Sequence, residues 1–289
     1  MLFMLKRLMC ACVVVAAGAA GSVAAHAQWL DYPTPGVPRL ANGKVDLSAK
    51  APRGRDGKPD LSGVWQTELE TAEEIARRSK DEAANALIVP GDDPRTFSRY
   101  FFNVLADFTA ADAPMRPATV AYMREIGERK AGNPSGLCLP HGLPQGDLMS
   151  YAPFKILQTP GVIAVLYELD NNFRQIYTDG RSLPKDPNPA WGGYSVGKWV
   201  GDTLVVDAAG FNARTKLDVA GHPHSEALHI QERFHRRDFG HMDVTITIDD
   251  PVMYTKPFTV KATEVLLPDS DVLETVCNEN EKDGAHLSK

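Results

Sequence analysis

Residues 154–178 read FKILQTPGVIAVLYELDNNFRQIYT, and this stretch decides the expected fold. Three short runs rich in β-branched, aliphatic and aromatic residues are separated by Thr-Pro-Gly and Asp-Asn-Asn, which are turn sequences at hairpin spacing. We therefore expect neighbouring antiparallel strands over 154–159, 162–169 and 173–178.

The same alternation of short apolar runs and turn sequences continues to residue 277. Six further strands are expected over 194–199, 203–207, 226–236, 242–248, 258–267 and 272–277. An earlier strand is expected around PDLSGVW, residues 59–65, because the tryptophan in it needs burial. So many strands in one open sheet would leave exposed edges. The predicted fold is therefore mainly β, an antiparallel lipocalin-like barrel, with a two-sheet sandwich as the alternative.

The first 27 residues have the features of a secretory signal peptide. Lys6 and Arg7 precede an apolar stretch, which ends in small residues and the sequence Ala25-His26-Ala27. Glycines interrupt the apolar stretch, which argues against a retained transmembrane helix, so no stable membrane insertion is expected. The predicted location is periplasmic or extracellular.

The remaining chain is expected to form an arm and one domain. Five prolines between residues 28 and 59 favour an extended Pro-rich arm. Residues 60–289 are expected to form a single β-barrel domain with a helical insertion at about 68–132. Within the insertion, helices are predicted over 68–87, 98–108 and 117–130 from helix-forming composition and from Pro117 at a first helical position.

Composition and motifs exclude several classes of protein. The chain has 289 residues, with Lys+Arg 31, Asp+Glu 37 and a formal net charge of −6, so it lacks the basic excess of a nucleic-acid binder. Its 43% hydrophobic content is enough for a sizeable core. No Gly-x-Gly-x-x-Gly before a helix, P-loop, His-Glu-x-x-His or Cys-x-x-Cys-His is present. We expect no cofactor, and the sequence does not indicate an oligomeric state.

The cysteines predict one disulfide. Cys10 and Cys12 lie in the leader, which leaves Cys138 and Cys277 in an oxidising compartment. Use of these thiols for metal binding or nucleophilic chemistry would need a Cys-x-x-Cys or a neighbouring histidine, and His141 is the only one nearby.

Several motifs together resemble a family of largely uncharacterised secreted bacterial proteins. They are PDLSGVW (59–65), TDGR (178–181), GYSVG (193–197), GDTLVVD (201–207) and GHPHS (221–225). The resemblance covers nearly all of the chain after the leader. It implies export but carries no reaction, ligand or catalytic residue.

Glu232 is the best single candidate for acid–base chemistry. On the predicted strand 226–236, the period of two places Leu228, Ile230, Glu232 and Phe234 on one face, which is otherwise apolar. A carboxylate in a buried row must be paired or have a raised pKa. The alternative is a structural ion pair, for example with Arg174.

A histidine-rich segment precedes and overlaps this strand. Five of the histidines lie between residues 222 and 241. His222 and His224 are two residues apart, so in an extended segment both imidazoles point to one face, as a metal or substrate site on a β-scaffold requires. The alternatives are a divalent-metal site using His222 and His224, acid–base use of His224, or a loop of solvated histidines.

The strand 173–178 mixes polar and apolar side chains, as a cavity for an amphipathic small molecule requires. Arg174 and Tyr177 are expected to orient a substrate or stabilise developing negative charge. The remaining substrate-binding candidates are Trp191, Tyr194, Trp199, Asp179 and Arg181, although core packing and turn pairing are the ordinary roles of such residues.

The predicted function is an exported lyase or isomerase. It would perform cofactor-independent elimination, isomerisation or hydration on a small amphipathic or aromatic molecule, with Glu232 and His224 as acid and base. The alternatives are a non-catalytic small-ligand binding protein, a divalent-metal enzyme using the His-x-His loop, and a structural envelope protein.

Overall fold

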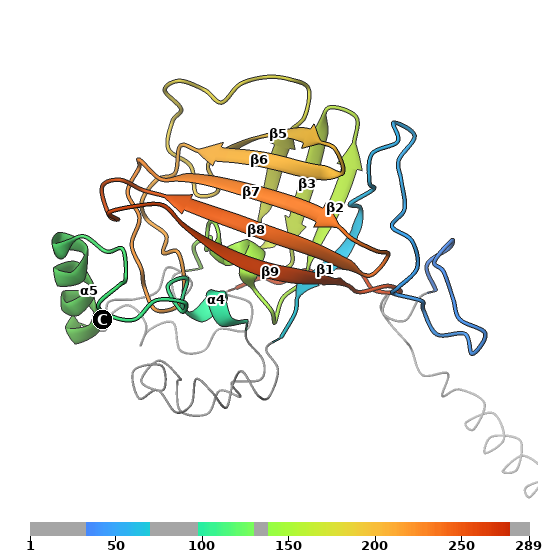
Figure 1. The fold of residues 1–289 in the computed structure, drawn as a ribbon, viewed down its shortest axis with the longest axis horizontal. Coiled ribbons are helices and arrows are strands. Elements are labelled where there is room, and N and C mark those ends of the chain that lie inside the picture. Colours follow the sequence, from blue (N-terminus) through green and yellow to red (C-terminus); the bar gives the residue numbers. More distant parts are fainter. Residues whose placement is uncertain (1–32, 70–97, 130–137, 278–289) are drawn as a thin grey trace, which may run out of the picture.

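The computed structural model describes residues 33–69, 98–129 and 138–277 of the chain. In these parts nine strands form one closed barrel in which each strand pairs with its neighbours in the sequence and β1 pairs with β9 (Figure 1). The strands are β1 (Gly63–Thr67), β2 (Phe154–Thr159), β3 (Val162–Tyr167), β4 (Phe173–Tyr177), β5 (Tyr194–Val200), β6 (Thr203–Ala209), β7 (His229–Arg236), β8 (His241–Asp249) and β9 (Phe258–Leu266). The predicted barrel is confirmed.

One seam of the barrel departs from antiparallel pairing. β4 and β5 run parallel, and their register contains only Ile176 with Ser195 and Tyr177 with Val196. A parallel pair needs a long connection, which residues 178–193 supply. Because the shared register is so short, the beginning of β4 is paired with β3 but not with β5.

The interior is filled by alternate residues of the strands. On β8, Met242, Val244, Ile246 and Ile248 are all buried, as the period of two requires. Between Ile156, Ile163, Leu204 and Phe234 the remaining cavity measures only about 10 Å³. The barrel is therefore a packed core over much of its length.

The two ends of the barrel are closed differently. At the end where β7 finishes, the Arg236 guanidinium lies 4.8 Å from the Trp65 ring centre and 5.3 Å from that of Phe239. It donates hydrogen bonds to the backbone carbonyls of Asp60 and Phe239. At the opposite end, the 3-10 helix η3 (Gln145–Leu148) lies over the barrel and inserts the fully buried Leu148.

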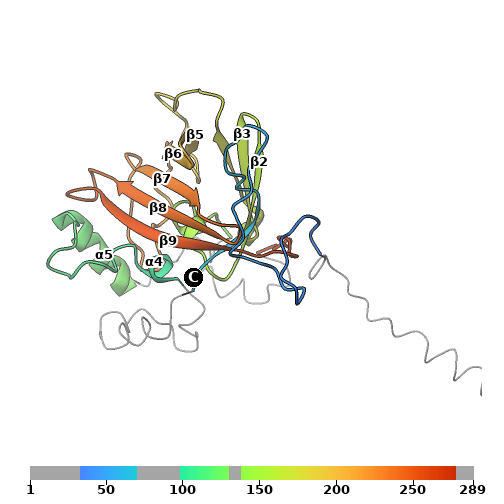
Figure 2. The ribbon, with the colours of Figure 1, turned by 45° about the vertical axis from the view of Figure 1, so that its right-hand side comes forward.

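The helices differ in part from those expected. α5 (Pro117–Arg129) confirms the helix over 117–130 and lies outside the barrel (Figure 2), where Thr119 donates a hydrogen bond to the Met253 carbonyl. The helix predicted over 98–108 is wrong in length, because the observed helix α4 (Arg99–Phe102) has only one turn. The chain leaves the helix there because the Asp218 carboxylate accepts a hydrogen bond from the Val104 N–H. The helix predicted over 68–87 lies almost wholly outside the described residues.

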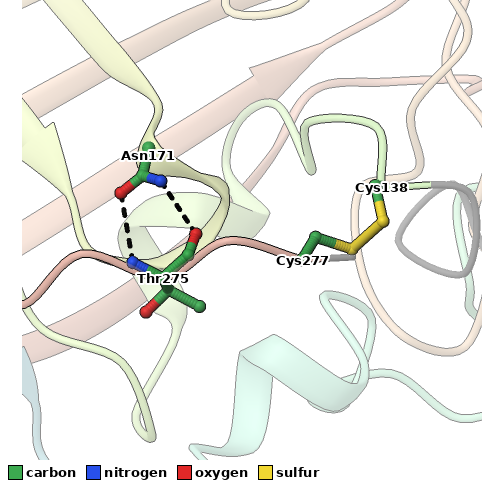
Figure 3. The surroundings of a disulfide bond; sticks show 4 residues. All are labelled: Cys138, Asn171, Thr275 and Cys277. Atoms are coloured by element: carbon green, nitrogen blue, oxygen red, sulfur yellow. Dashed lines mark hydrogen bonds between the residues drawn. A yellow bond between two sulfur atoms is a disulfide. The ribbon is translucent and has the colours of Figure 1, made fainter. Parts of the chain in front are cut away.

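The strand predicted over 272–277 is also wrong. This segment joins no sheet. Side chains of the β3–β4 connection, which includes the 3-10 helix η4 (Leu169–Asn171), hold it instead. The Asn171 amide bonds both the N–H and the carbonyl of Thr275 (Figure 3). Glu168 accepts a hydrogen bond from the Leu273 N–H. The barrel closes through β9 and β1, so no edge remains for a further strand.

The disulfide between Cys138 and Cys277 is confirmed (Figure 3). Their Cα atoms are 5.5 Å apart and 139 positions apart in the sequence. The bond joins the loop before η3 to the last described residues, so it fixes both at the η3 end of the barrel.

Ion pairs attach the described part of the Pro-rich arm to the barrel. Arg39 pairs with Asp269, and Arg53 pairs with Asp202 at the β5–β6 turn. No helix in the described part of the chain has the length and apolar character needed to cross a membrane.

Candidate functional site

A buried ion pair crosses the interior of the barrel. Glu232 on β7 is fully buried, and Arg174 on β4 is 6% exposed. Arg174 Nη1 donates to Glu232 Oε1 at 3.0 Å, and Nη2 donates to Oε2. The predicted apolar row around Glu232 is confirmed. The Glu232 carboxylate is held by an ion pair with Arg174, which the sequence offered as the alternative to a role in acid–base chemistry.

Asp147 adds a second carboxyl to the same guanidinium. It belongs to η3 and is brought to the barrel interior because Leu148 beside it fills the core. Arg174 Nη1 donates to Asp147 Oδ2 at 3.0 Å, while Arg174 Nε donates to the Ser195 hydroxyl at 2.9 Å. The phenol of Tyr167, at the end of β3, lies 2.5 Å from Asp147 Oδ1.

Glu264 on β9 is a third buried carboxyl near the others. The Thr67 hydroxyl is 3.2 Å from both Glu264 Oε1 and the Asp147 backbone carbonyl, so it lies between the two acids. Glu264 Oε2 is buried and has no hydrogen-bond partner among the described residues. We name Asp147, Tyr167, Arg174, Glu232 and Glu264 the polar cluster.

The polar cluster contains three carboxyls and one guanidinium, so it cannot hold all its acids ionised at low cost. Burial raises the pKa of Asp147 well above its usual range, and the negative charge of Glu232 adds to this against the opposing effect of Arg174. Burial and then the charge of Asp147 raise the pKa of Glu264. These raised pKa values favour the neutral forms of Asp147 and Glu264 beside the Arg174–Glu232 ion pair.

Tyr167 and Arg174 also border a cavity beside the beginning of β4. The cavity measures about 30 Å³, within a recess of about 470 Å³ that includes space open to solvent. Apolar side chains form most of the wall, namely Leu143, Met149, Ala152, Pro153, Leu169 and Phe173. The polar side chains on the wall are His141, Tyr167, Asn172 and Arg174. Apolar walls with a few polar groups are typical of a small-molecule site.

The histidine-rich segment is buried rather than solvated at its start. His222 Nδ1 is 2.6 Å from Asp218 Oδ2. His224 Nε2 is 2.6 Å from the Thr215 hydroxyl, and His224 Nδ1 is 3.1 Å from the Ser225 carbonyl. Because a carbonyl only accepts, Nδ1 carries the proton and Nε2 accepts from Thr215. Burial lowers the pKa of His224, which favours this neutral form.

The His224 pair lies next to the cavity wall but not on it. A Cβ atom added at Gly142, which lines the cavity, would be 2.8 Å from the Thr215 hydroxyl. Both nitrogens of His224 are engaged, so neither is directed at a ligand. Among the described residues, no group of three or more histidine, cysteine, aspartate or glutamate side chains is placed to hold a metal ion.

The other predicted site residues lie apart from the polar cluster. The Tyr177 ring packs against the Arg181 guanidinium 3.8 Å from its centre, and Arg181 pairs with Asp179 on the surface. Trp191 packs against Arg214, and Trp199 packs against the apolar core. Of the predicted site residues, Arg174 lines the cavity, and so does Gly192 next to Trp191. The described lining residues do not include Trp191, Tyr194, Trp199, Tyr177, Asp179 or Arg181.

Four residues of the site were not predicted as such: His141, Asp147, Tyr167 and Glu264. Tyr167 and Glu264 each lie inside an apolar strand sequence, and Glu264 shares the β9 face of the buried Val260 and Leu266. The same alternation that identified Glu232 could have found Glu264. Asp147 and His141 lie in a loop region, where the sequence carries no periodicity to use.

Comparison of the chain with protein-family models, curated proteins and solved structures finds no match.

Proposed function

We propose that this protein is an exported enzyme that performs cofactor-independent acid–base chemistry on a small amphipathic molecule bound in the cavity beside η3. The observation that carries the proposal is the Tyr167 phenol. It borders an apolar cavity and is hydrogen-bonded to a buried carboxyl, Asp147. Phenol and carboxyl groups in such surroundings are typical proton donors in catalysis.

The cavity wall supports an amphipathic ligand. Its aliphatic and aromatic part would supply affinity, and the groups at the Tyr167 side would orient a polar end. Phe173 is 64% exposed at the rim and would cover the outer part of the ligand.

In this proposal the acid–base roles move from Glu232 and His224 to the groups on the cavity wall. Glu232 serves as the counter-ion that fixes Arg174 behind the wall. Arg174 in turn orients Asp147, which contacts Tyr167. His224 fixes Thr215 against the back of Gly142 and thereby supports the wall.

Ligand binding is tested with the fluorescent amphipathic anion 8-anilinonaphthalene-1-sulfonate. Gly192→Trp should fill the recess, because no atom lies within 4 Å of a Cβ added there. Val200→Trp, at the other end of the barrel and 53% exposed, is the matched control. We expect the wild type and Val200→Trp to bind the probe and Gly192→Trp to lose binding. Equal binding by all three would remove the cavity from the proposal.

Catalysis is tested in D₂O with a mixture of small aromatic and aliphatic acids, alcohols and ketones, followed by mass spectrometry. Isomerisation, elimination and hydration change either the deuterium or the water content of a substrate. We expect such a change with wild-type protein and its loss in Tyr167→Phe.

The second candidate is a binding protein without turnover. It is favoured by the Arg174 guanidinium, whose Nε, Nη1 and Nη2 all donate to protein acceptors and hold the cluster fixed. If compounds bind but are recovered unchanged from D₂O, this candidate replaces the enzyme.

A further inference from the structure

The cavity beside η3 offers no free charge to a ligand. Arg174 is the only arginine, lysine, aspartate or glutamate among its described lining residues. The guanidinium is already paired, because Nη1 and Nη2 both donate to the Glu232 carboxylate and Nη1 also donates to Asp147. Arg174 Nε donates to the Ser195 hydroxyl, so four of the five guanidinium hydrogens have acceptors within the protein.

Binding of a charged ligand at this wall would therefore cost free energy. An ionised group that leaves water for apolar surroundings needs a partner of opposite charge. An anion placed next to Arg174 would also lie near the Glu232 and Asp147 carboxyls, which already occupy the guanidinium. The other titratable side chains of the wall, His141 and Tyr167, have interaction partners of their own within the chain. The wall thus favours a ligand without a net charge.

Asn172 has a polar group that the protein leaves unused. It lines the cavity and directly precedes β4, and its backbone carbonyl accepts a hydrogen bond from the Tyr167 N–H. A backbone N–H only donates, so the side-chain atom 2.9 Å from the Phe173 nitrogen is the oxygen Oδ1, and the amide nitrogen is the other end of the group. No described residue accepts from Asn172 Nδ2, and Nδ2 is not among the buried atoms that lack a partner, so it is accessible.

We propose that the site takes an uncharged molecule with an apolar body and a hydrogen-bond acceptor, such as a ketone, ester or ether, and that the Asn172 amide nitrogen donates to this acceptor. This rests on the proposed function and narrows its substrate class, because carboxylic acids and amines are ionised at neutral pH and would be excluded. Since the cavity itself measures only about 30 Å³, the apolar body lies mainly in the adjoining recess, next to Phe173. Asn172 is thus the residue that determines specificity for an acceptor.

The charge preference is tested with wild-type protein and three compounds that share one ring system: 2-acetylnaphthalene, 2-naphthoate and 2-naphthylmethylammonium. Each is titrated to displace N-phenyl-1-naphthylamine, a fluorescent relative of 8-anilinonaphthalene-1-sulfonate that lacks the sulfonate. We expect 2-acetylnaphthalene to displace the probe at least about tenfold more effectively than either ion, because neither ion finds a partner of opposite charge at the wall. This comparison does not depend on the folding of a variant.

The role of Asn172 is tested with 2-ethylnaphthalene, which has a methylene group in place of the carbonyl of 2-acetylnaphthalene. Asn172→Asp keeps an oxygen for the Phe173 N–H but replaces the amide donor with a carboxylate oxygen. The affinity for the ketone relative to 2-ethylnaphthalene should fall at least about threefold, as for the loss of one hydrogen bond. The affinity for 2-naphthylmethylammonium relative to the ketone should rise at least about tenfold, because the wall then holds a free negative charge.

Gln175→Glu is the matched control for Asn172→Asp. It makes the same change from amide to carboxylate on an exposed side chain of β4 that is not among the described lining residues. Both affinity ratios should equal those of the wild type.

Displacement by 2-naphthoate or 2-naphthylmethylammonium that matches 2-acetylnaphthalene in the wild type would overturn the inference. Affinity ratios in Asn172→Asp that equal those of the wild type and Gln175→Glu would also overturn it. Either result leaves the proposed function standing, because binding of 8-anilinonaphthalene-1-sulfonate and its loss in Gly192→Trp test the cavity itself. Failure of the wild type to bind either fluorescent probe would remove the proposed function as well.

Discussion

The buried pair of Arg174 and Glu232 should make a large and non-additive contribution to stability. In Arg174→Met, the side chain keeps much of its volume but leaves the fully buried Glu232 without a cation. Nitrogens that donate to Glu232, Asp147 and Ser195 are lost together. Removing one partner of a buried ion pair costs about 3–5 kcal/mol, and we expect this loss in the free energy of unfolding.

The double variant distinguishes a buried charge from lost packing. Arg174→Met with Glu232→Leu removes both charges and leaves Asp147 hydrogen-bonded to Tyr167. We expect it to recover at least about half of the loss, with a coupling energy of about 2–4 kcal/mol between the two positions. Arg181→Met is the matched control, because its pair with Asp179 is exposed, and it should leave stability unchanged.

Urea unfolding followed by tryptophan fluorescence measures these differences, since Trp65 is fully buried in the barrel. The slope with urea should stay the same in all variants, because each exposes the same surface on unfolding. A cost below about 1 kcal/mol for Arg174→Met, or a double variant whose loss equals the sum of the two single losses, would refute a buried charged pair.

Two further predictions concern the pKa of Glu264 and the disulfide. Because burial raises the pKa of Glu264 in the folded state, the folded protein binds more protons than the unfolded chain between the two values, and stability falls as pH rises through that window. Urea unfolding of Glu264→Gln from pH 5 to pH 8 should show a shallower fall than the wild type, and an identical fall would contradict the assignment of a protonated Glu264. Cys138→Ala with Cys277→Ala should lose about 4–5 kcal/mol by the chain-entropy relation for the long loop that the bond closes. Reduced wild type should unfold at the same urea concentration as this variant, and a large remaining difference would show that the substitutions act through packing.

The fold followed largely from local sequence pattern. Alternating apolar residues and turn sequences identified all eight strands after residue 150, and the need to bury Trp65 identified β1. Closure into a barrel followed from the number of strands and the cost of exposed edges. The strand predicted over 272–277 is wrong, because local sequence pattern does not show whether the sheet has an unpaired edge strand with which this segment could pair.

The candidate site followed only in part. The period of two placed Glu232 in a buried row and suggested Arg174 as its partner, because a carboxylate in apolar surroundings requires a cation. Asp147 and His141 were not found, because they lie in segments without periodicity whose position depends on how η3 fits over the barrel end.

The sequence by itself determined the strands, the face of each strand that is buried, and the pairing of the two cysteines, because these depend on residue type and spacing along the chain. Tertiary structure alone decided that β4 and β5 meet in a short parallel seam, that a cavity opens beside it, and that Asp147 reaches Tyr167. These features depend on contacts between segments far apart in the chain, whose geometry is set by barrel closure and not by local preference.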